Sequence, residues 1–182
     1  ISGAGTVTTG AVTQTAGSGD INTTYTYTGG AKALTGGAVT AAAAANADLN
    51  AVVNVAAAAG AVAVGALSYT GSGSAAGDVT SVSLTATGTE STGTVALAGL
   101  TVNEGALNTS TTTVDLQGLG GAVTLTALTL TDSDTNSINL NADSSNVTLT
   151  TLTNTVSTTT DIVVSAASGQ TATIGTWLVR ET

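Results

Sequence analysis

The chain has 182 residues and a formal net charge of -9, because 11 acidic residues stand against two basic ones, Lys32 and Arg180. Thr makes up about a fifth of the chain, whereas His, Cys, Met, Phe and Pro are absent. This composition excludes thiol and histidine chemistry, and the scarcity of Lys and Arg argues against nucleic acid and anionic membrane surfaces as partners.

The length predicts a single domain, which we expect to span residues 1–182. Hydrophobic residues make up 42% of the chain and charged residues 7%, the reverse of the pattern in disordered proteins. The Ala-rich segment 41–66 is long and apolar, but Asn46, Asp48 and Asn50 interrupt it. We therefore do not interpret it as a transmembrane span, and we expect no membrane insertion.

The first predicted strands lie in residues 5–14, GTVTTGAVTQ, where Val7 and Thr9 stand on one parity and Val12 and Gln14 on the other. Further copies follow in chain order, and their first inward positions are Ala33 in the weaker copy AKALTGGAVT, Val62, Val95, Val123, Val147 and Ala172. The steps between first positions are 26, 29, 33, 28, 24 and 25 residues. The chain therefore repeats with a variable period of 24–33 residues.

The change of parity is clearest in residues 121–131, GAVTLTALTLT. Val123 and Leu125 alternate with Thr, and Leu128 and Leu130 continue on the opposite parity. Side chains of a strand alternate between faces, so an uninterrupted strand would place the two pairs on opposite faces. A corner of two small residues between two strands would keep both pairs inside.

A third apolar pair follows in several units, usually just after Asp or Asn: Val82 and Leu84, Val114 and Leu116, Ile138 and Leu140, Ile162 and Val164. Three short strands per unit, two of them joined by a tight corner, predict one coil of a parallel β-solenoid. One coil buries too few side chains to offset its ordering entropy, so coils must stack. We expect an all-β fold, a parallel β-solenoid (β-helix) of about seven coils, with an antiparallel β-sandwich as the alternative.

The segments GTVALAGLTVNEGALNTS and GAVTLTALTLTDSDTNSINLNADSSNVTLTTLTNT resemble secreted bacterial surface β-helix proteins of the filamentous-haemagglutinin and large-adhesin kind. The likeness is one of repeat style and period over most of the chain, and it assigns no functional residue. It implies a secreted or cell-surface location.

Residues 132–137, DSDTNS, place Asp132, Asp134 and Asn136 at alternate positions, as at the start of a calcium-binding loop. The Gly and Glu that an EF-hand loop carries at its sixth and twelfth positions are missing, and so is the Gly-Gly-x-Gly-x-Asp calcium repeat. We favour a solvated turn over a metal site, and calcium is the one cofactor the sequence brings into consideration.

Most acidic residues, we expect, mark turns: Asp20, Asp48, Asp78, Glu90, Glu104, Asp115, Asp143 and Asp161. Polysaccharide-degrading enzymes use paired carboxylates or basic residues in a cleft. With no His and two cationic residues, this chain offers little for such chemistry. We predict that the protein is not an enzyme and has no catalytic or cofactor-binding residues.

Thr fills many predicted outward positions: Thr24, Thr26, Thr28, Thr124, Thr126, Thr129, Thr131, Thr148, Thr150, Thr151 and Thr153. Stacked on successive coils, these residues would form flat ladders, similar to the Thr-x-Thr faces of β-helical antifreeze proteins. Thr also has a high strand propensity and keeps an uncharged surface soluble. Because the Thr residues are spread over several faces, we favour this second explanation and keep ice binding as an alternative.

The ends of a solenoid expose unpaired backbone and core, which must be capped or paired with another molecule. Trp177 occupies an inward position of the last coil and is expected to plug the core, with Leu178 and Val179 beside it. The candidate assembly interface comprises Ile1, Trp177, Leu178 and Val179, through which a homo-polymer would form.

The sequence therefore predicts a secreted or cell-surface structural protein, a self-assembling subunit of a filament, surface layer or adhesin stalk. One alternative is an ice-binding protein. The other is a pilus-like β-sandwich subunit that polymerises by donor-strand exchange.

Overall fold

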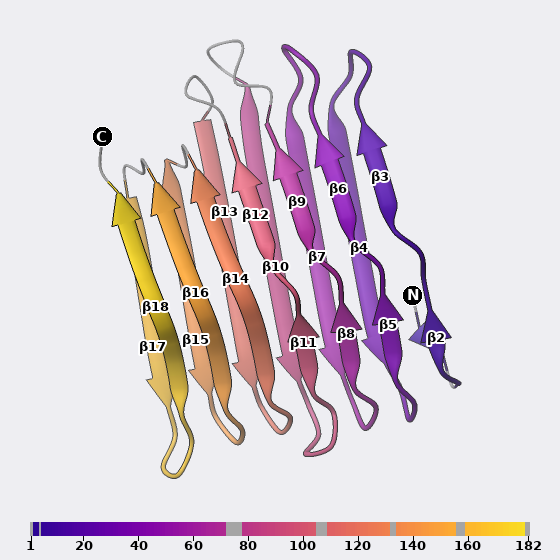
Figure 1. Ribbon diagram of the computed structural model, residues 1–182, viewed down its shortest axis with the longest axis vertical. Coiled ribbons are helices and arrows are strands. Elements are labelled where there is room, and N and C mark those ends of the chain that lie inside the picture. Colours follow the sequence, from indigo (N-terminus) through magenta and orange to yellow (C-terminus); the bar gives the residue numbers. More distant parts are fainter. Residues whose placement is uncertain are drawn as a thin grey trace.

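The computed structural model describes residues 2–3, 5–71, 78–104, 109–131, 134–155 and 159–180. Strands connect into a solenoid of about 6 turns, close to the predicted seven, and no helix occurs in these ranges. Two layers of strands face each other, and successive coils lie side by side along the stack (Figure 1). The predicted all-β parallel β-solenoid is confirmed.

The back sheet has seven strands, which pair in chain order. They are β1 (Ser2–Gly3), β4 (Ile21–Gly29), β7 (Leu49–Ala57), β10 (Val79–Gly88), β13 (Thr109–Gly118), β15 (Thr135–Ala142) and β17 (Thr159–Ala166).

The front sheet has eleven strands, because most coils contribute two short ones. They are β2 (Val7–Thr8), β3 (Val12–Thr15), β5 (Leu34–Gly36), β6 (Val39–Ala42), β8 (Val62–Val64), β9 (Leu67–Thr70), β11 (Val95–Leu97), β12 (Leu100–Asn103), β14 (Val123–Thr131), β16 (Val147–Thr155) and β18 (Ala172–Arg180). Every strand pairing between described residues, from β1–β4 to β16–β18, is parallel, so the antiparallel β-sandwich alternative is wrong.

The core consists of columns in which equivalent residues of successive coils stack. One column contains Val62, Val95, Val123 and Val147, all buried. The columns also correct the predicted inward positions of the copy AKALTGGAVT by one residue. Leu34, rather than Ala33, pairs with Val7 and Val62, because the larger apolar side chain takes the inward position and is 2% exposed.

The parity change is not a corner between two faces of the solenoid, which corrects the sequence prediction. β8 and β9 flank the break in one coil, yet both belong to the front sheet. β14 runs through the break as one strand, and its pairing with β16 skips Thr126 while Leu125 and Ala127 on either side are paired. The register is the same on both sides of the break, so neither strand carries an extra residue and the break is a local distortion shared by successive coils. Each coil therefore has two layers rather than three sides.

Candidate functional site

The C-terminal coil, formed by β17 and β18, leaves its apolar side chains uncovered. Trp177 is 55% exposed and Val179 49%, although Leu152, which pairs with Trp177 from the preceding coil, is 0% exposed. Among the described residues, no strand pairs with the outer edge of β17 or β18. Trp177 therefore occupies the inward position predicted for it, and its side chain is exposed because no further coil of the described chain covers it.

Two exposed apolar residues of this coil point outward rather than into the core column. Leu178 pairs with Thr153 and Val163 with Asn139, both in outward columns that are otherwise mostly polar. They are 41% and 51% exposed. The predicted interface residues Trp177, Leu178 and Val179 thus lie together at one end of the stack, whereas Ile1 lies outside the described residues.

The N-terminal end is more polar than the C-terminal end. Val7 is half-buried and Val12 is exposed, but the other inward positions of this coil are occupied by Thr9 and Gln14. The Tyr25 hydroxyl donates a hydrogen bond to Gln14 Oε1 at 3.3 Å. Apolar exposure is therefore concentrated at the C-terminal end.

The outer face of the front sheet carries two regular columns that are small and uncharged in all coils but the last. The first contains Thr13, Thr40, Ser68, Thr101, Thr129 and Thr153 and ends at Leu178, and the second, two residues further along each strand, contains Thr15, Ala42, Thr70, Asn103, Thr131 and Thr155 and ends at Arg180. Of the expected outward Thr residues, only Thr24, Thr26 and Thr28 lie instead on the back sheet. The structure thus collects most of them on the outer face of the front sheet.

The outer face of the back sheet is different, because amide and acidic side chains bond to one another across coils. Asn139 Nδ2 donates to Asp115 Oδ1 at 2.9 Å, and the Gln117 amide donates to Asp115 Oδ2. Ser165 Oγ donates to Asn141 Oδ1 at 3.1 Å. Asp115 therefore lies within β13 rather than in the turn predicted for it.

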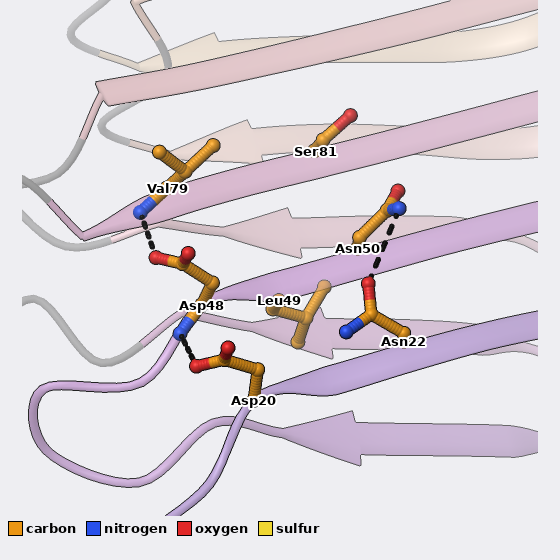
Figure 2. Close-up of a pocket in the computed structure, with 7 residues that line it drawn as sticks. All are labelled: Asp20, Asn22, Asp48, Leu49, Asn50, Val79 and Ser81. Carbon is orange, nitrogen blue, oxygen red and sulfur yellow. Dashed lines mark hydrogen bonds between the residues drawn. The ribbon is translucent and has the colours of Figure 1, made fainter.

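A hollow of about 400 Å³ lies where the strands of this sheet begin (Figure 2). Asp20 Oδ1 accepts a hydrogen bond from the Asp48 backbone N–H at 3.1 Å, and Asp48 Oδ1 accepts one from Val79 N–H at 2.7 Å. Asn50 Nδ2 donates to Asn22 Oδ1 at 3.4 Å. Each of these two carboxylates caps the next strand, which agrees with the predicted turn positions.

Of the proposed calcium ligands, Asp134 and Asn136 contact different partners. Asp134 Oδ2 accepts from the Ser110 backbone N–H at 3.1 Å, and the Asp134 N–H donates to Ser110 Oγ at 2.7 Å. Asn136 is 1% exposed and donates to Thr160 Oγ1 inside the stack. Asp132 lies outside the described residues. Within the described ranges, no group of three or more His, Cys, Asp or Glu residues could hold a metal ion.

The interior contains polar groups that the sequence patterns did not predict. Glu104, expected in a turn, is 0% exposed, and its Oε1 accepts a hydrogen bond from Thr112 Oγ1 at 3.0 Å. Asn154 Nδ2 donates to Thr160 Oγ1 at 2.7 Å. Alternation marks Thr112 and Asn154 as inward, so their parity is the signal that could have found them.

Tyr69 lies in the apolar part of the core, in the column of Val102. It is 0% exposed, and its hydroxyl has no hydrogen-bond partner among the described residues. Burial raises the pKa of Tyr69, and the nearby Tyr25 and Tyr27 raise it further. Its hydroxyl is therefore held in the neutral form.

No match was found when the chain was compared with models of known protein families, with curated proteins and with solved structures. In the described part of the chain there is no helix long and apolar enough to cross a membrane.

Proposed function

We propose that the protein is a non-catalytic structural component of the cell exterior. Its solenoids assemble through their ends into a filament, a surface layer or the stalk of an adhesin. The supporting observation is the uncovered C-terminal coil, where Trp177 and Val179 continue columns that are buried in the inner coils.

The energetics favour assembly at this end. Each inner coil is held by parallel backbone ladders on both sides and by apolar columns, whereas β17 and β18 have such a partner on one side only. Covering a large apolar side chain contributes about 1.5–3 kcal/mol, so several exposed side chains together provide a substantial driving force.

Electron microscopy of the purified protein over a range of concentrations tests this proposal. Filaments or sheets are the expected result. Single short rods at every concentration, together with an unchanged sedimentation coefficient, would exclude assembly through the ends.

Ice binding is a second candidate function, and the two Thr-rich columns of the front sheet favour it. Neighbouring coils lie about 4.8 Å apart, and residues two positions apart on a strand are separated by about 6.6 Å. Hydroxyl and methyl groups therefore form a flat two-dimensional grid. The twelve positions before the last coil carry no charge, which suits a face that orders water rather than ions, and the last coil ends the two columns with Leu178 and Arg180.

Thermal hysteresis measurements on the purified protein test this candidate. If the grid binds ice, T129K should abolish hysteresis, because it places a charged, flexible side chain within the grid. T113K is the matched control, since Thr113 points outward from the back sheet. Absence of hysteresis in the unmodified protein would exclude ice binding.

A further inference from the structure

We propose that two copies of the protein join through their C-terminal coils about a twofold axis, with β18 pairing antiparallel to β18 and β17 antiparallel to β17. This inference adds a contact geometry to the proposed function. It rests on that function only because it uses the same C-terminal end of the molecule. The occupant of the uncovered end is a second copy of the chain, and the contact is closed rather than head-to-tail.

The apolar character of the two ends selects this partner. Head-to-tail stacking would continue the front-sheet columns by placing Ala172 over Val7, Trp177 over Val12, Ile174 over Thr9 and Val179 over Gln14. Two of these four contacts would cover an apolar side chain with a polar one, including the contact made by the large Ile174. Contact between two C-terminal ends instead buries apolar against apolar.

The break in alternation gives β18 a symmetric pattern of inward and outward residues. Ala172 and Ile174 point inward before the break, and Trp177 and Val179 point inward after it, as their pairing with β16 shows. A twofold axis between Gly175 and Thr176 places Ile174 opposite Trp177 of the second copy and Ala172 opposite Val179. An uninterrupted strand could not pair with itself in this way about a point between two residues, because adjacent residues face opposite sides.

β17 obeys the same symmetry when the axis passes through Val163. Inward Ile162 then lies opposite Val164 of the second copy, and outward Val163 lies opposite Val163. This explains why Val163 and Leu178 are apolar on the otherwise polar outer faces, since Leu178 meets the Thr173 methyl group across the junction. Outward Asp161 lies opposite Ser165, so no like charges meet.

A single twofold axis can pass through Val163 of β17 and through the point between Gly175 and Thr176 of β18, because these two points lie across the core from each other. The Tyr27 ring lies against Gly36, where an added Cβ would be 2.6 Å from Tyr27 Cε1. The columns of these two residues lead to Val164 and Ile174 in the last coil. Val163 therefore faces the break at Gly175.

The size of the contact sets its expected strength. A strand about 30 Å long and sheets about 10 Å apart give an end face on the order of 500 Å² per copy, side chains included. The total is at the low end for specific interfaces, so we expect a dimer that dissociates in the micromolar range.

Cysteine cross-linking tests the symmetry, because the chain contains no Cys. Residues directly opposite in an antiparallel pair have Cα atoms about 4.5–5.5 Å apart, within the range of a disulfide. V163C should therefore form a disulfide-linked dimer under mild oxidation. N139C, one coil further from the axis in the same column, should not. Linked dimers of N139C equal to those of V163C would overturn the proposal.

Sedimentation and light scattering of the unmodified chain provide the second test. Dimers that the double variant V163D/L178D converts to monomers, with an unchanged circular dichroism spectrum, are expected. Assemblies larger than dimers that persist in this variant would overturn the twofold contact while supporting end assembly of another geometry. A chain that stays monomeric up to about millimolar concentration, well above the expected micromolar range, would overturn both. Dimers without filaments or layers would leave the inference standing and refute the structural role.

Discussion

Tyr69 is a residue at which a smaller side chain should stabilise the fold. Its buried hydroxyl is desolvated without a partner, a cost of about 1–3 kcal/mol. We expect Y69F to raise the free energy of unfolding by about 1 kcal/mol, measured by urea denaturation. Y25F is the control, because it removes the hydrogen bond to Gln14 and should give no gain. A Y69F variant less stable than the unmodified protein would contradict this account.

The same hydroxyl predicts a loss of stability at alkaline pH. Burial raises the pKa of Tyr69 in the folded protein, whereas the unfolded chain releases this proton near pH 10. The stability that this raised pKa contributes is complete below about pH 10. Above that value the unfolded chain releases the proton while the folded protein keeps it, so the free energy of unfolding falls as pH rises. Unfolding midpoints at about pH 8 and about pH 11 should differ, and less so in Y69F. Because burial also raises the pKa of Tyr27, part of the pH dependence should remain in Y69F.

Thr112 should be required for the buried position of Glu104. T112V removes the donor to Glu104 Oε1, and hydrogen bonds to charged groups contribute about 1.5–3 kcal/mol, so we expect a loss of that size in unfolding free energy. T112S keeps the hydroxyl and should lose less. T111V, on the exposed neighbour, should change stability by about 0.5 kcal/mol or less. Equal stability of T112V and T111V would contradict the proposed role of the hydrogen bond.

At the scale of elements, close backbone approach at the turns limits which residues fit. A Cβ at Gly93, before β11, would collide with the carbonyl oxygen of Ala58 in the preceding coil. We expect G93A to cost at least about 2 kcal/mol, measured by thermal unfolding. G19A is the matched control, because a Cβ there meets no atom within 4 Å. A G93A variant as stable as G19A would show that the turn can shift freely.

Strand alternation carried most of the fold prediction, because it reports directly on which side chains face the core. It identified Val62, Leu125 and Leu152 as inward and gave the correct period for most coils. It could not distinguish a break within one sheet from a corner between two faces, since both reverse parity while keeping the apolar residues inside. In the weaker copy, Ala33 and Leu34 are adjacent apolar residues, and only the registration with neighbouring coils decides between them.

The candidate site was predicted in part. Trp177, Leu178 and Val179 lie at the end of the stack as expected, because their place in the last repeat is visible in the sequence. The apolar outward position of Val163 becomes informative only when its column is known to hold Asn139 and Asp115. The alignment of Thr residues into two columns likewise depends on insertions between coils, whose lengths the pattern leaves variable.

At the scale of the molecule, stability should be distributed along the stack, because each coil contacts mainly its neighbours. A chain that ends at Thr155 lacks β17 and β18 and should still fold. Its unfolding midpoint should fall modestly, because one inter-coil interface is lost. Circular dichroism and urea denaturation measure both properties. Loss of the β-sheet signal would instead show that the C-terminal coil is required to nucleate the fold.

The first and last coils lie at opposite ends of the stack (Figure 1). A pulling force applied between the two ends therefore acts across the strands and along the inter-coil hydrogen bonds. Both layers of a coil boundary share that load, so the bonds of two strands must fail together rather than one after another. A rod of this kind resists tension between its ends much better than peeling of a single terminal strand, the property required of a tether that bears load outside a cell.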